Sequence, residues 1–351
     1  MDSMANLESC SACPDISLSK LVTNATSPST QPFRILSLSG GGFLGYYTAL
    51  VLEGLEGELG EPLARRFDLI AGTSIGGILA LAIAFEIPMS RMTRLLAEHG
   101  ADVFSTRSLP TGALGSLLDM SRSVMGPKYS GTALRQSLLA EFGTHCLGDL
   151  AHPVVVPAVD VLTCRTKTFK TPHSPAAEGD GGLALVDVAM ATCAAPAYFP
   201  SVRIGDRLYA DGGLFAVAPD QVALHEAQHF IGVDPQRVTM LAIGTATRHY
   251  RPSSGVPDDA GAVGWLTQGR LVLTMMAAQQ QHVQAMVEDR LGERYLRLDI
   301  DWPPDAGLGI DVATPAARKT LSRLARETLA AARGRSLSRF IGSAREHANP
   351  G

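Results

Sequence analysis

The chain has 351 residues, of which 46% are hydrophobic and 18% are charged. That composition is sufficient to bury a large core in one sizeable domain or two smaller ones. The formal net charge of −4 argues against general nucleic-acid binding. No basic start is followed by an apolar core, so we expect no secretory signal, and five cysteines, an odd number, fit a reduced cytosolic compartment.

Residues 1–31 are rich in Ser, Thr, Asn and Pro and lack periodicity, so we expect a flexible leader there. Cys10 and Cys13 have the spacing of a metal-ligand pair, but no second pair follows, and we expect no metal site. After the leader we expect a catalytic domain over 32–250 and a mostly helical extension over 251–351 that packs on it.

The first pattern predicts a strand over Phe33–Leu38 and then a helix over Phe43–Leu59. Gly40, Gly41 and Gly42 lie between them. Three glycines at a strand-to-helix turn expose successive N–H groups at the positive end of a helix, which suits a phosphate or a developing oxyanion. The sequence therefore predicts an anion site at this turn.

The same turn, with Gly45, also satisfies the G-x-G-x-x-G dinucleotide-binding fingerprint. A Rossmann site needs an acidic residue about 20 positions further on, at the end of the next strand. Here the next strand, Phe67–Ala71, carries Asp68 near its start. The fingerprint is incomplete, and a dinucleotide-dependent oxidoreductase is kept as an alternative.

A second strand-to-helix turn joins the strand Phe67–Ala71 to a buried helix over Ile78–Ala84. It reads G-x-S-x-G, with Ser74 between Gly72 and Gly76. In a nucleophile elbow the two glycines avoid collisions with neighbouring backbone, and the serine Oγ projects into a cleft. The turn predicts a serine hydrolase with Ser74 as nucleophile; the alternative is that this serine only caps the helix.

A serine nucleophile needs a base, and none of the nine histidines lies beside a turn motif. His225 and His229 are four apart in an expected helix, with no third residue to complete a metal site. Asp211 instead follows a short apolar strand and precedes Gly212 and Gly213. A carboxylate at the end of such a strand is placed where active sites form in α/β sheets, although Asp-Gly is also a common turn. A direct Ser–Asp dyad requires desolvation and a close hydrogen bond to make the carboxylate a better base.

In their order and setting these motifs resemble those of the patatin-like phospholipases, over roughly residues 33 to 246. Five motifs carry the resemblance: Gly40-Gly41-Gly42 with Gly45, Gly72-Thr73-Ser74-Ile75-Gly76, Ala194-Ala195-Pro196-Ala197-Tyr198-Phe199-Pro200, Asp211-Gly212-Gly213 and Ile243-Gly244-Thr245. The resemblance implies an α/β fold, a three-layer α/β/α sandwich around a mainly parallel sheet. It also implies that Ser74 attacks an acyl ester and Asp211 is the general base, with no metal. The amides of Gly40, Gly41 and Gly42 would then form the oxyanion hole.

Two departures from the family pattern stand out. Leu44 occupies the place where the family usually has Arg or Lys, just before the last glycine of the oxyanion loop. Ala216-Val217-Ala218-Pro219 replaces the usual Asn-Pro ending after the Asp-Gly-Gly turn. The first change puts the order of the oxyanion loop in question, so a non-catalytic lipid-binding module with this fold is a third alternative.

Within the family, the patterns Leu36–Gly42 and Phe67–Ser74 look similar to bacterial patatin effectors of cyclic-nucleotide antiphage signalling (CBASS). This resemblance implies activation by a cyclic dinucleotide and degradation of membrane glycerophospholipids. It also implies a cytoplasmic protein that is peripheral to the inner membrane face when active. The sequence leaves open the nucleotide pocket, the acyl position cleaved and the oligomeric state, a homo-oligomer included.

Three further segments bear on lipid access. Residues 112–126 interleave apolar side chains with Gly, Ser and Arg, as in an interfacial lid or a packed core segment. Leu271–Val287 has one apolar helical face, for which core packing is the default interpretation. The basic stretch from Arg318 to Arg345 would contact anionic lipid, a nucleotide phosphate or solvent.

Overall fold

The computed structural model describes residues 31–106, 126–174, 179–248, 261, 264–265, 270–303, 306–333 and 337–342. Pro32–Gly351 forms one compact unit. Cys10, Cys13 and all but the last residue of each of the segments 1–31 and 112–126 lie outside the described residues. No helix in the described part of the chain is both long enough and apolar enough to cross a bilayer.

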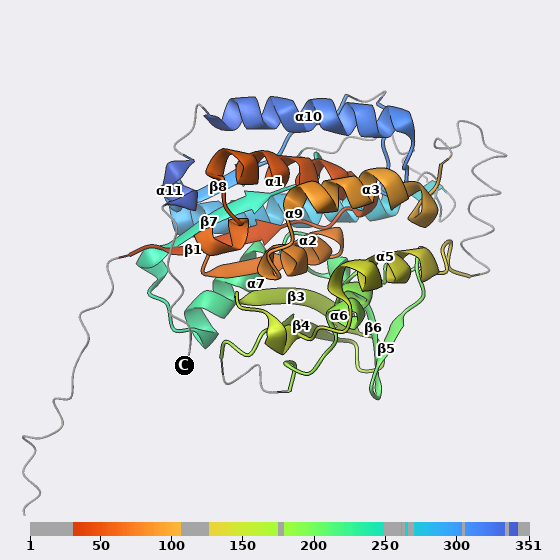
Figure 1. Ribbon diagram of the computed structural model, residues 1–351, viewed down its shortest axis with the longest axis horizontal. Coiled ribbons are helices and arrows are strands. Elements are labelled where there is room, and N and C mark those ends of the chain that lie inside the picture. The colour runs from red at the N-terminus through yellow and green to blue at the C-terminus, as the bar shows by residue number, and fades with distance from the viewer. Residues whose placement is uncertain are drawn as a thin grey trace, which may run out of the picture. The chain divides into compact units, whose positions relative to one another are not determined.

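The described residues form an eight-stranded sheet in the order β5-β6-β3-β2-β1-β7-β8, with β4 pairing separately with β3 (Figure 1). The strands are β1 (Phe33–Leu38), β2 (Leu69–Gly72), β3 (Val154–Asp160), β4 (Arg165–Lys170), β5 (Val202–Ile204), β6 (Arg207–Asp211), β7 (Val238–Ile243) and β8 (Tyr295–Leu298). Strands β3, β2, β1, β7 and β8 run parallel, whereas β4, β5 and β6 join antiparallel. The expected mainly parallel centre is confirmed.

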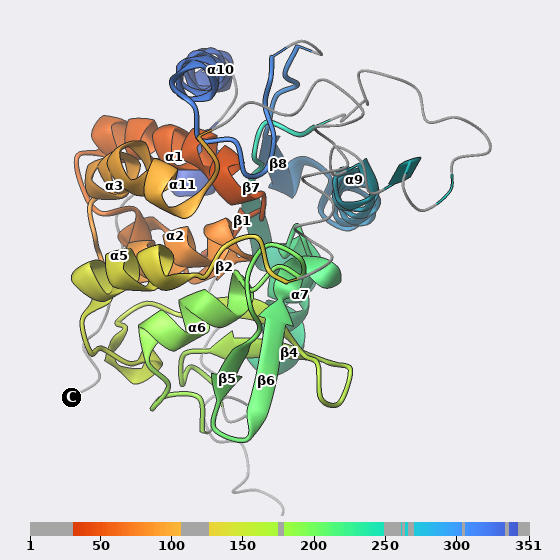
Figure 2. The ribbon, with the colours of Figure 1, turned by 90° about the vertical axis from the view of Figure 1, so that its right-hand side faces the viewer.

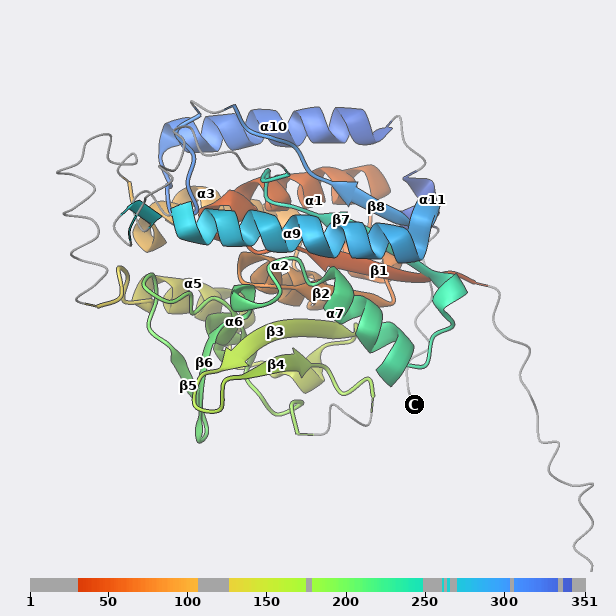
Figure 3. The ribbon, with the colours of Figure 1, turned by 180° about the vertical axis from the view of Figure 1, so that it is seen from behind.

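Helices cover both faces of this sheet (Figures 2 and 3). The helices on one face are α1 (Gly45–Leu59), α2 (Ile75–Ala84), α3 (Met89–Val103), α5 (Thr132–Phe142) and α6 (Leu185–Thr192), and α10 (Pro315–Arg333) packs on the outside of α1. The helices on the other face are α7 (Asp220–His225) and α9 (Arg270–Leu291). The short helix α11 (Ser338–Ile341) contacts β7. Alternate residues of β1 enter the two cores, Leu36 and Leu38 on one side and Ile35 on the other. The predicted three-layer α/β/α sandwich is confirmed.

The ladder around β3 brings two distant turns together. Strand β4 pairs along β3 from Val155 to Asp160, so β2 and β6 must share the opposite edge. There β2 pairs with the first two residues of β3, and β6 pairs with the last three. Because β2 and β6 run in opposite directions, the chain that leaves β2 and the last residue of β6 meet at one point of this edge.

The predicted elements agree closely with the observed ones. Strand β1 has the expected bounds, and the helix expected over Phe43–Leu59 begins with one 3-10 turn (Gly42–Leu44) and ends at Gly60, whose φ is +69°. Helix α2 begins at Ile75, three residues earlier than the apolar pattern alone suggested. In the C-terminal part, β8 extends the same sheet, so this region contributes a strand as well as helices.

Candidate active site

The elbow between β2 and α2 places Ser74 in a strained backbone conformation, with φ of +56°. Close packing dictates the glycines on either side of it. A Cβ atom on Gly72 would lie 2.0 Å from the carbonyl oxygen of Gly76, and one on Gly76 would lie 2.3 Å from that of Leu38. Both glycines are therefore required by neighbouring backbone, as the sequence predicted, and Ser74 occupies a position that few non-glycine residues adopt.

A threonine that the sequence analysis did not single out fixes the backbone of the elbow. The Ser74 N–H donates to Thr192 Oγ1 at 3.0 Å, and that hydroxyl donates to the carbonyl of Pro157 at 2.6 Å. Thr192 is fully buried at the C-terminal end of α6. The sequence signal for Thr192 is a polar residue at the end of an apolar helix, two positions before the Ala194–Pro200 motif.

The structure brings Ser74 and Asp211 into direct contact, although 137 positions separate them in the sequence. Ser74 Oγ donates to Asp211 Oδ2 at 2.8 Å, and the Gly213 N–H donates to Asp211 Oδ1 at 2.6 Å. Gly212 allows the turn to lie against β3, because a Cβ there would be 2.3 Å from the carbonyl oxygen of Pro157. Each carboxylate oxygen thus has one defined donor.

Burial raises the pKa of the carboxyl group in this pair. Asp211 is only 6% exposed, and burial raises its pKa to about 6, against the opposing effects of the hydrogen bonds from Gly213 and Ser74. A carboxylate with a raised pKa is a stronger base near neutral pH. No histidine within the described residues hydrogen-bonds to Ser74 or Asp211, so the direct dyad predicted from the sequence has the contacts it requires.

The three glycines of the predicted oxyanion hole have different roles. The Gly40 N–H donates to the carbonyl of Val217 at 2.8 Å, so in this structure it is already used. Gly41 and Gly42 line the same cavity as Ser74, and their N–H groups have no hydrogen bond to any described residue. Gly45 permits close approach of α1 and α2, because a Cβ there would lie 2.3 Å from Ile75 Cγ1. The predicted oxyanion donors therefore reduce to Gly41 and Gly42.

The position where the family usually has Arg or Lys belongs to the hydrophobic core in this protein. Leu44 is fully buried among apolar side chains. Val217, in the segment that departs from the Asn-Pro pattern, supplies the carbonyl that holds Gly40. Neither departure takes part in the Ser74–Asp211 hydrogen bond.

A cavity of about 210 Å³ opens beside Ser74 and Asp211. Its walls are almost wholly apolar and come from both sides of the site, α3 and α5 on one and α9 on the other. The apolar side chains that line the cavity include Ile75, Ile78, Leu95, Leu96, Val103, Phe104, Leu134, Leu138, Val272, Met275 and Met276. A cavity with such walls suits a ligand that carries a long apolar chain.

Within the described residues, no group of three or more His, Cys, Asp and Glu side chains is placed to hold a metal ion. His225 and His229 stack on each other with ring centroids 5.0 Å apart. Gly40 and Phe43 donate their N–H groups to carbonyls of this chain, Val217 and Ile310. Two of the amides that a dinucleotide phosphate would use are therefore occupied.

Comparison with known proteins decides between the remaining interpretations. A family model described as patatin-like phospholipase matches residues 36–224, more than half of the chain, and this range includes Ser74 and Asp211. This chain belongs to the patatin-like phospholipase family. Four of the five motifs lie within the matched residues, and the predicted fold class agrees with this family.

Three relatives are similar over most of their length, and each is described as a cGAMP-activated phospholipase. The protein from Pseudomonas aeruginosa (strain BWHPSA011 / Pa011) is 42% identical over 78% of this chain and 80% of its own. That from Vibrio cholerae serotype O1 is 34% identical over 87% of this chain and 90% of its own. That from Escherichia coli (strain TW11681) is 33% identical over 82% of this chain and 86% of its own.

Several of the basic side chains near the C-terminus have acidic partners within the chain. Arg323 pairs with Glu327 at 2.6 Å on the exposed side of α10, Arg333 pairs with Glu58 at 2.6 Å, and Arg339 pairs with Glu293 at 3.3 Å. Exposed pairs of this kind contribute little stability. Contact of this region with lipid or a nucleotide phosphate stays a prediction.

Proposed function

We propose that this protein is a lipid acyl hydrolase that cleaves fatty acyl esters of membrane glycerophospholipids through a Ser74–Asp211 dyad. The observation that carries the proposal is the 2.8 Å hydrogen bond from Ser74 Oγ to a buried carboxylate at the wall of an apolar cavity. Membership of the patatin-like phospholipase family supports the reaction class. The non-catalytic alternative is disfavoured, because both proposed reacting side chains are in contact.

In the acylation step Ser74 Oγ attacks the ester carbonyl while Asp211 Oδ2 accepts its proton. The carbonyl oxygen becomes negatively charged, and the N–H groups of Gly41 and Gly42 stabilise that charge. The tetrahedral intermediate collapses, the bond to the glycerol oxygen breaks, and Asp211 returns the proton to this oxygen. A lysolipid leaves, and the acyl group remains on Ser74.

In the second step a water molecule donates a proton to Asp211 and attacks the acyl carbonyl. The same two amides stabilise the charge again, and collapse of this intermediate breaks the bond to Ser74 Oγ. The proton returns to the serine, and a fatty acid is released. Every proton transfer uses one carboxylate, and the raised pKa of Asp211 supports that double role.

We further propose that a cyclic dinucleotide activates the enzyme and that it acts in the cytoplasm, at the inner face of the membrane. The support is that all three relatives described above are named cGAMP-activated phospholipases. Activation by such a messenger accords with a role in cyclic-nucleotide antiphage signalling. The proposed membrane contact follows from the substrate, because glycerophospholipids are presented to the enzyme at a bilayer surface.

Labelling with a fluorophosphonate probe tests the nucleophile. We expect peptide mass spectrometry to find the adduct on Ser74, and none in Ser74→Ala. We expect Ser74→Ala and Asp211→Asn to reduce fatty-acid release at least about 1,000-fold, because loss of one catalytic-triad member in a serine protease costs more than that. An adduct on another residue of an active preparation would refute Ser74 as the nucleophile. Turnover retained in Asp211→Asn would refute Asp211 as the general base and would indicate a histidine in that role.

Fatty-acid release from phospholipid vesicles tests substrate and activator together. The assay compares phosphatidylethanolamine–phosphatidylglycerol vesicles without nucleotide, with cGAMP and with other cyclic dinucleotides. We expect release that depends on Ser74 and rises with cGAMP. Equal release with and without every nucleotide would leave the hydrolase assignment intact and would remove the proposed activator.

A further inference from the structure

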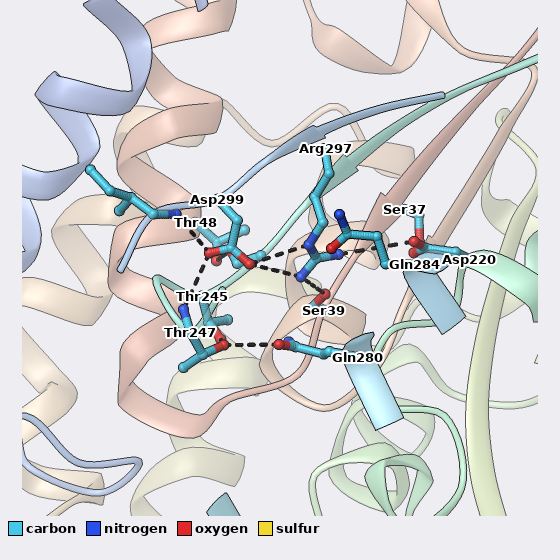
Figure 4. Close-up of polar contacts among 12 residues, drawn as sticks. Ser37, Ser39, Thr48, Asp220, Thr245, Thr247, Gln280, Gln284, Arg297 and Asp299 are labelled. Atoms are coloured by element: carbon cyan, nitrogen blue, oxygen red, sulfur yellow. Dashed lines mark hydrogen bonds and ion pairs between the residues drawn. The ribbon is translucent and has the colours of Figure 1, made fainter. Parts of the chain in front are cut away.

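A buried polar network lies behind the oxyanion loop, which we define as residues 39–45 (Figure 4). It connects this loop to the end of β7, to β8 and to α9. Its members with hydrogen bonds or ion pairs to one another are Ser37, Ser39, Asp220, Thr245, Thr247, Gln280, Arg297 and Asp299. The acyl-transfer steps use none of these side chains, so their arrangement needs another explanation.

Thr245 contacts the backbone that carries a proposed oxyanion donor. Its hydroxyl donates to the carbonyl oxygen of Gly40 at 3.4 Å. This carbonyl and the Gly41 N–H belong to one planar peptide and point in opposite directions, so fixing one fixes the other. Thr245 is fully buried and packs against the loop, since a Cβ on Gly41 would lie 2.6 Å from Thr245 Oγ1.

Helix α9 supports Gly40 from both sides. The Gly40 N–H donates to the Val217 carbonyl at 2.8 Å, and the Val217 N–H donates to Gln279 Oε1 at 3.3 Å. On the carbonyl side, Thr245 Oγ1 lies 3.2 Å from Thr247 Oγ1, which in turn lies 3.1 Å from Gln280 Oε1. Two consecutive glutamines of one helix thus end the two hydrogen-bonded chains that hold Gly40.

The hydrogen count along the second chain leaves two arrangements. When Thr247 donates to Gln280 Oε1, the single hydroxyl proton of Thr245 is divided between Thr247 Oγ1 and the carbonyl of Gly40. When the Gln280 amide is turned by half a rotation, Nε2 donates to Thr247, Thr247 donates to Thr245, and Thr245 donates wholly to Gly40. Gln280 is 3% exposed, and its Nε2 has no hydrogen-bond partner among the described residues in the first arrangement, which favours the second.

We propose that Thr245 is a positioning residue for the oxyanion hole, and that Gln280 directs the Thr245 hydroxyl toward the Gly40 carbonyl through Thr247. The inference rests on the proposed Ser74 hydrolase, because an oriented Gly41 N–H matters only when an oxyanion forms beside it. It assigns the orientation of the donor to residues more than 200 positions away in the chain. An oriented Gly41 N–H stabilises the transition state, which carries the oxyanion, and does not stabilise the bound substrate.

The test compares four variants in the full-length protein. Thr245→Val removes the hydroxyl and keeps the shape, Thr245→Ser restores the hydroxyl, and Gln280→Met removes the donor at the far end of the chain. Thr328→Val is the matched control, because Thr328 is also buried and its hydroxyl lies 2.8 Å from the hydroxyl of Tyr47, outside the loop. The measurements are kcat and KM on p-nitrophenyl butyrate with cGAMP present, thermal unfolding, and affinity for a trifluoromethyl ketone, which forms a charged tetrahedral adduct with a serine nucleophile.

We expect Thr245→Val to lower kcat by about 10- to 100-fold, less than the loss of a whole oxyanion donor, with KM within about twofold of the parent. Affinity for the ketone should fall by a similar factor. Thr245→Ser should recover most of kcat, and Gln280→Met should lower kcat about 3- to 10-fold. Thr328→Val should lose stability and keep kcat, because its hydroxyl contacts no part of the site.

Other outcomes overturn the inference. Parental kcat and ketone affinity in Thr245→Val, while Ser74→Ala is inactive, would refute the positioning role and leave the hydrolase intact. If Thr245→Val fails to fold, parental kcat in Gln280→Met refutes the chain of hydrogen bonds, and a lowered kcat with unchanged KM supports it. Absence of a Ser74 adduct in the active parent protein would instead refute the proposed function.

Discussion

The elbow and the oxyanion loop are both glycine-rich turns between a strand and a helix, yet the chain holds them in different ways. The elbow is shaped mainly by close backbone packing, of Gly72 on Gly76 and of Gly76 on the end of β1, and one distant side chain, Thr192, accepts the Ser74 N–H. The oxyanion loop is held chiefly by distant residues: Thr245 and Arg297 contact it through side chains, and Ile310 accepts the Phe43 N–H. The backbone at Ser74 is therefore set mainly by neighbouring segments, whereas the conformation of the oxyanion loop depends on the C-terminal third of the chain.

Removal of the buried cation behind the loop should have the largest effect on stability. Arg297 donates to Asp299 Oδ2 at 2.8 Å and to Ser39 Oγ at 3.2 Å, and its Nη1 lies 3.9 Å from Asp220 Oδ2. Arg297→Met leaves two buried carboxylates without their cation, so we expect the free energy of unfolding at pH 7 to fall by about 3–5 kcal/mol. Urea unfolding measures this loss, and kcat should fall with it because Ser39 belongs to the loop.

An exposed pair provides the control for Arg297. Arg323 and Glu327 lie one turn apart on α10, and both side chains are about half exposed. We expect Arg323→Met to cost at most about 0.5 kcal/mol. Equal urea midpoints for Arg297→Met and the parent would contradict the view that the loop depends on this network.

The contrast between the turns also explains how much the sequence could predict. Ser74 and Asp211 were predicted because each lies in a short motif, and the pairing of β2 and the antiparallel β6 along one edge of β3 then brings the two motifs together. The use of the Gly40 N–H by Val217 could not be predicted, because it depends on how the segment after Asp211 folds back. Arg297 gave no signal either: it lies in a short strand where an arginine is ordinarily exposed, and only the pairing of β8 with β7 buries it beside Asp299.

Ionisation of Asp211 should have the next largest effect and should link the dyad to stability. Burial raises its pKa from 3.8 to about 6, so the protonated form stabilises the native state. That contribution is fully present below the unfolded-state pKa and is lost as the pH rises through about 6. The shift corresponds to at most about 3 kcal/mol, and activity should change in the opposite sense, rising through the same midpoint as the base ionises.

Asp211→Asn isolates this effect, since the amide does not titrate. We expect the difference in unfolding free energy between variant and parent to move in favour of the variant between pH 4.5 and pH 8, by about 2 kcal/mol. Chemical denaturation at several pH values measures it. Parallel stability curves for the two proteins would show that Asp211 titrates near its ordinary pKa and is not a desolvated base.

The smallest stability effect distinguishes close packing from conformational preference at the elbow. A Cβ on Gly76 would lie 2.3 Å from the carbonyl oxygen of Leu38 and 2.7 Å from that of Ser39, and both are backbone atoms. We expect Gly76→Ala to cost about 1–3 kcal/mol and to reduce Ser74 labelling, because α2 must move away from β1.

Gly57 is also helical, is exposed, and has no atom within 4 Å of its Cβ position, so Gly57→Ala should stabilise the protein by about 0.5–1 kcal/mol. Opposite signs in thermal unfolding would confirm that backbone contact dictates the elbow glycine, whereas stabilisation by both alanines would show that the elbow has room for a side chain and that its geometry is set elsewhere.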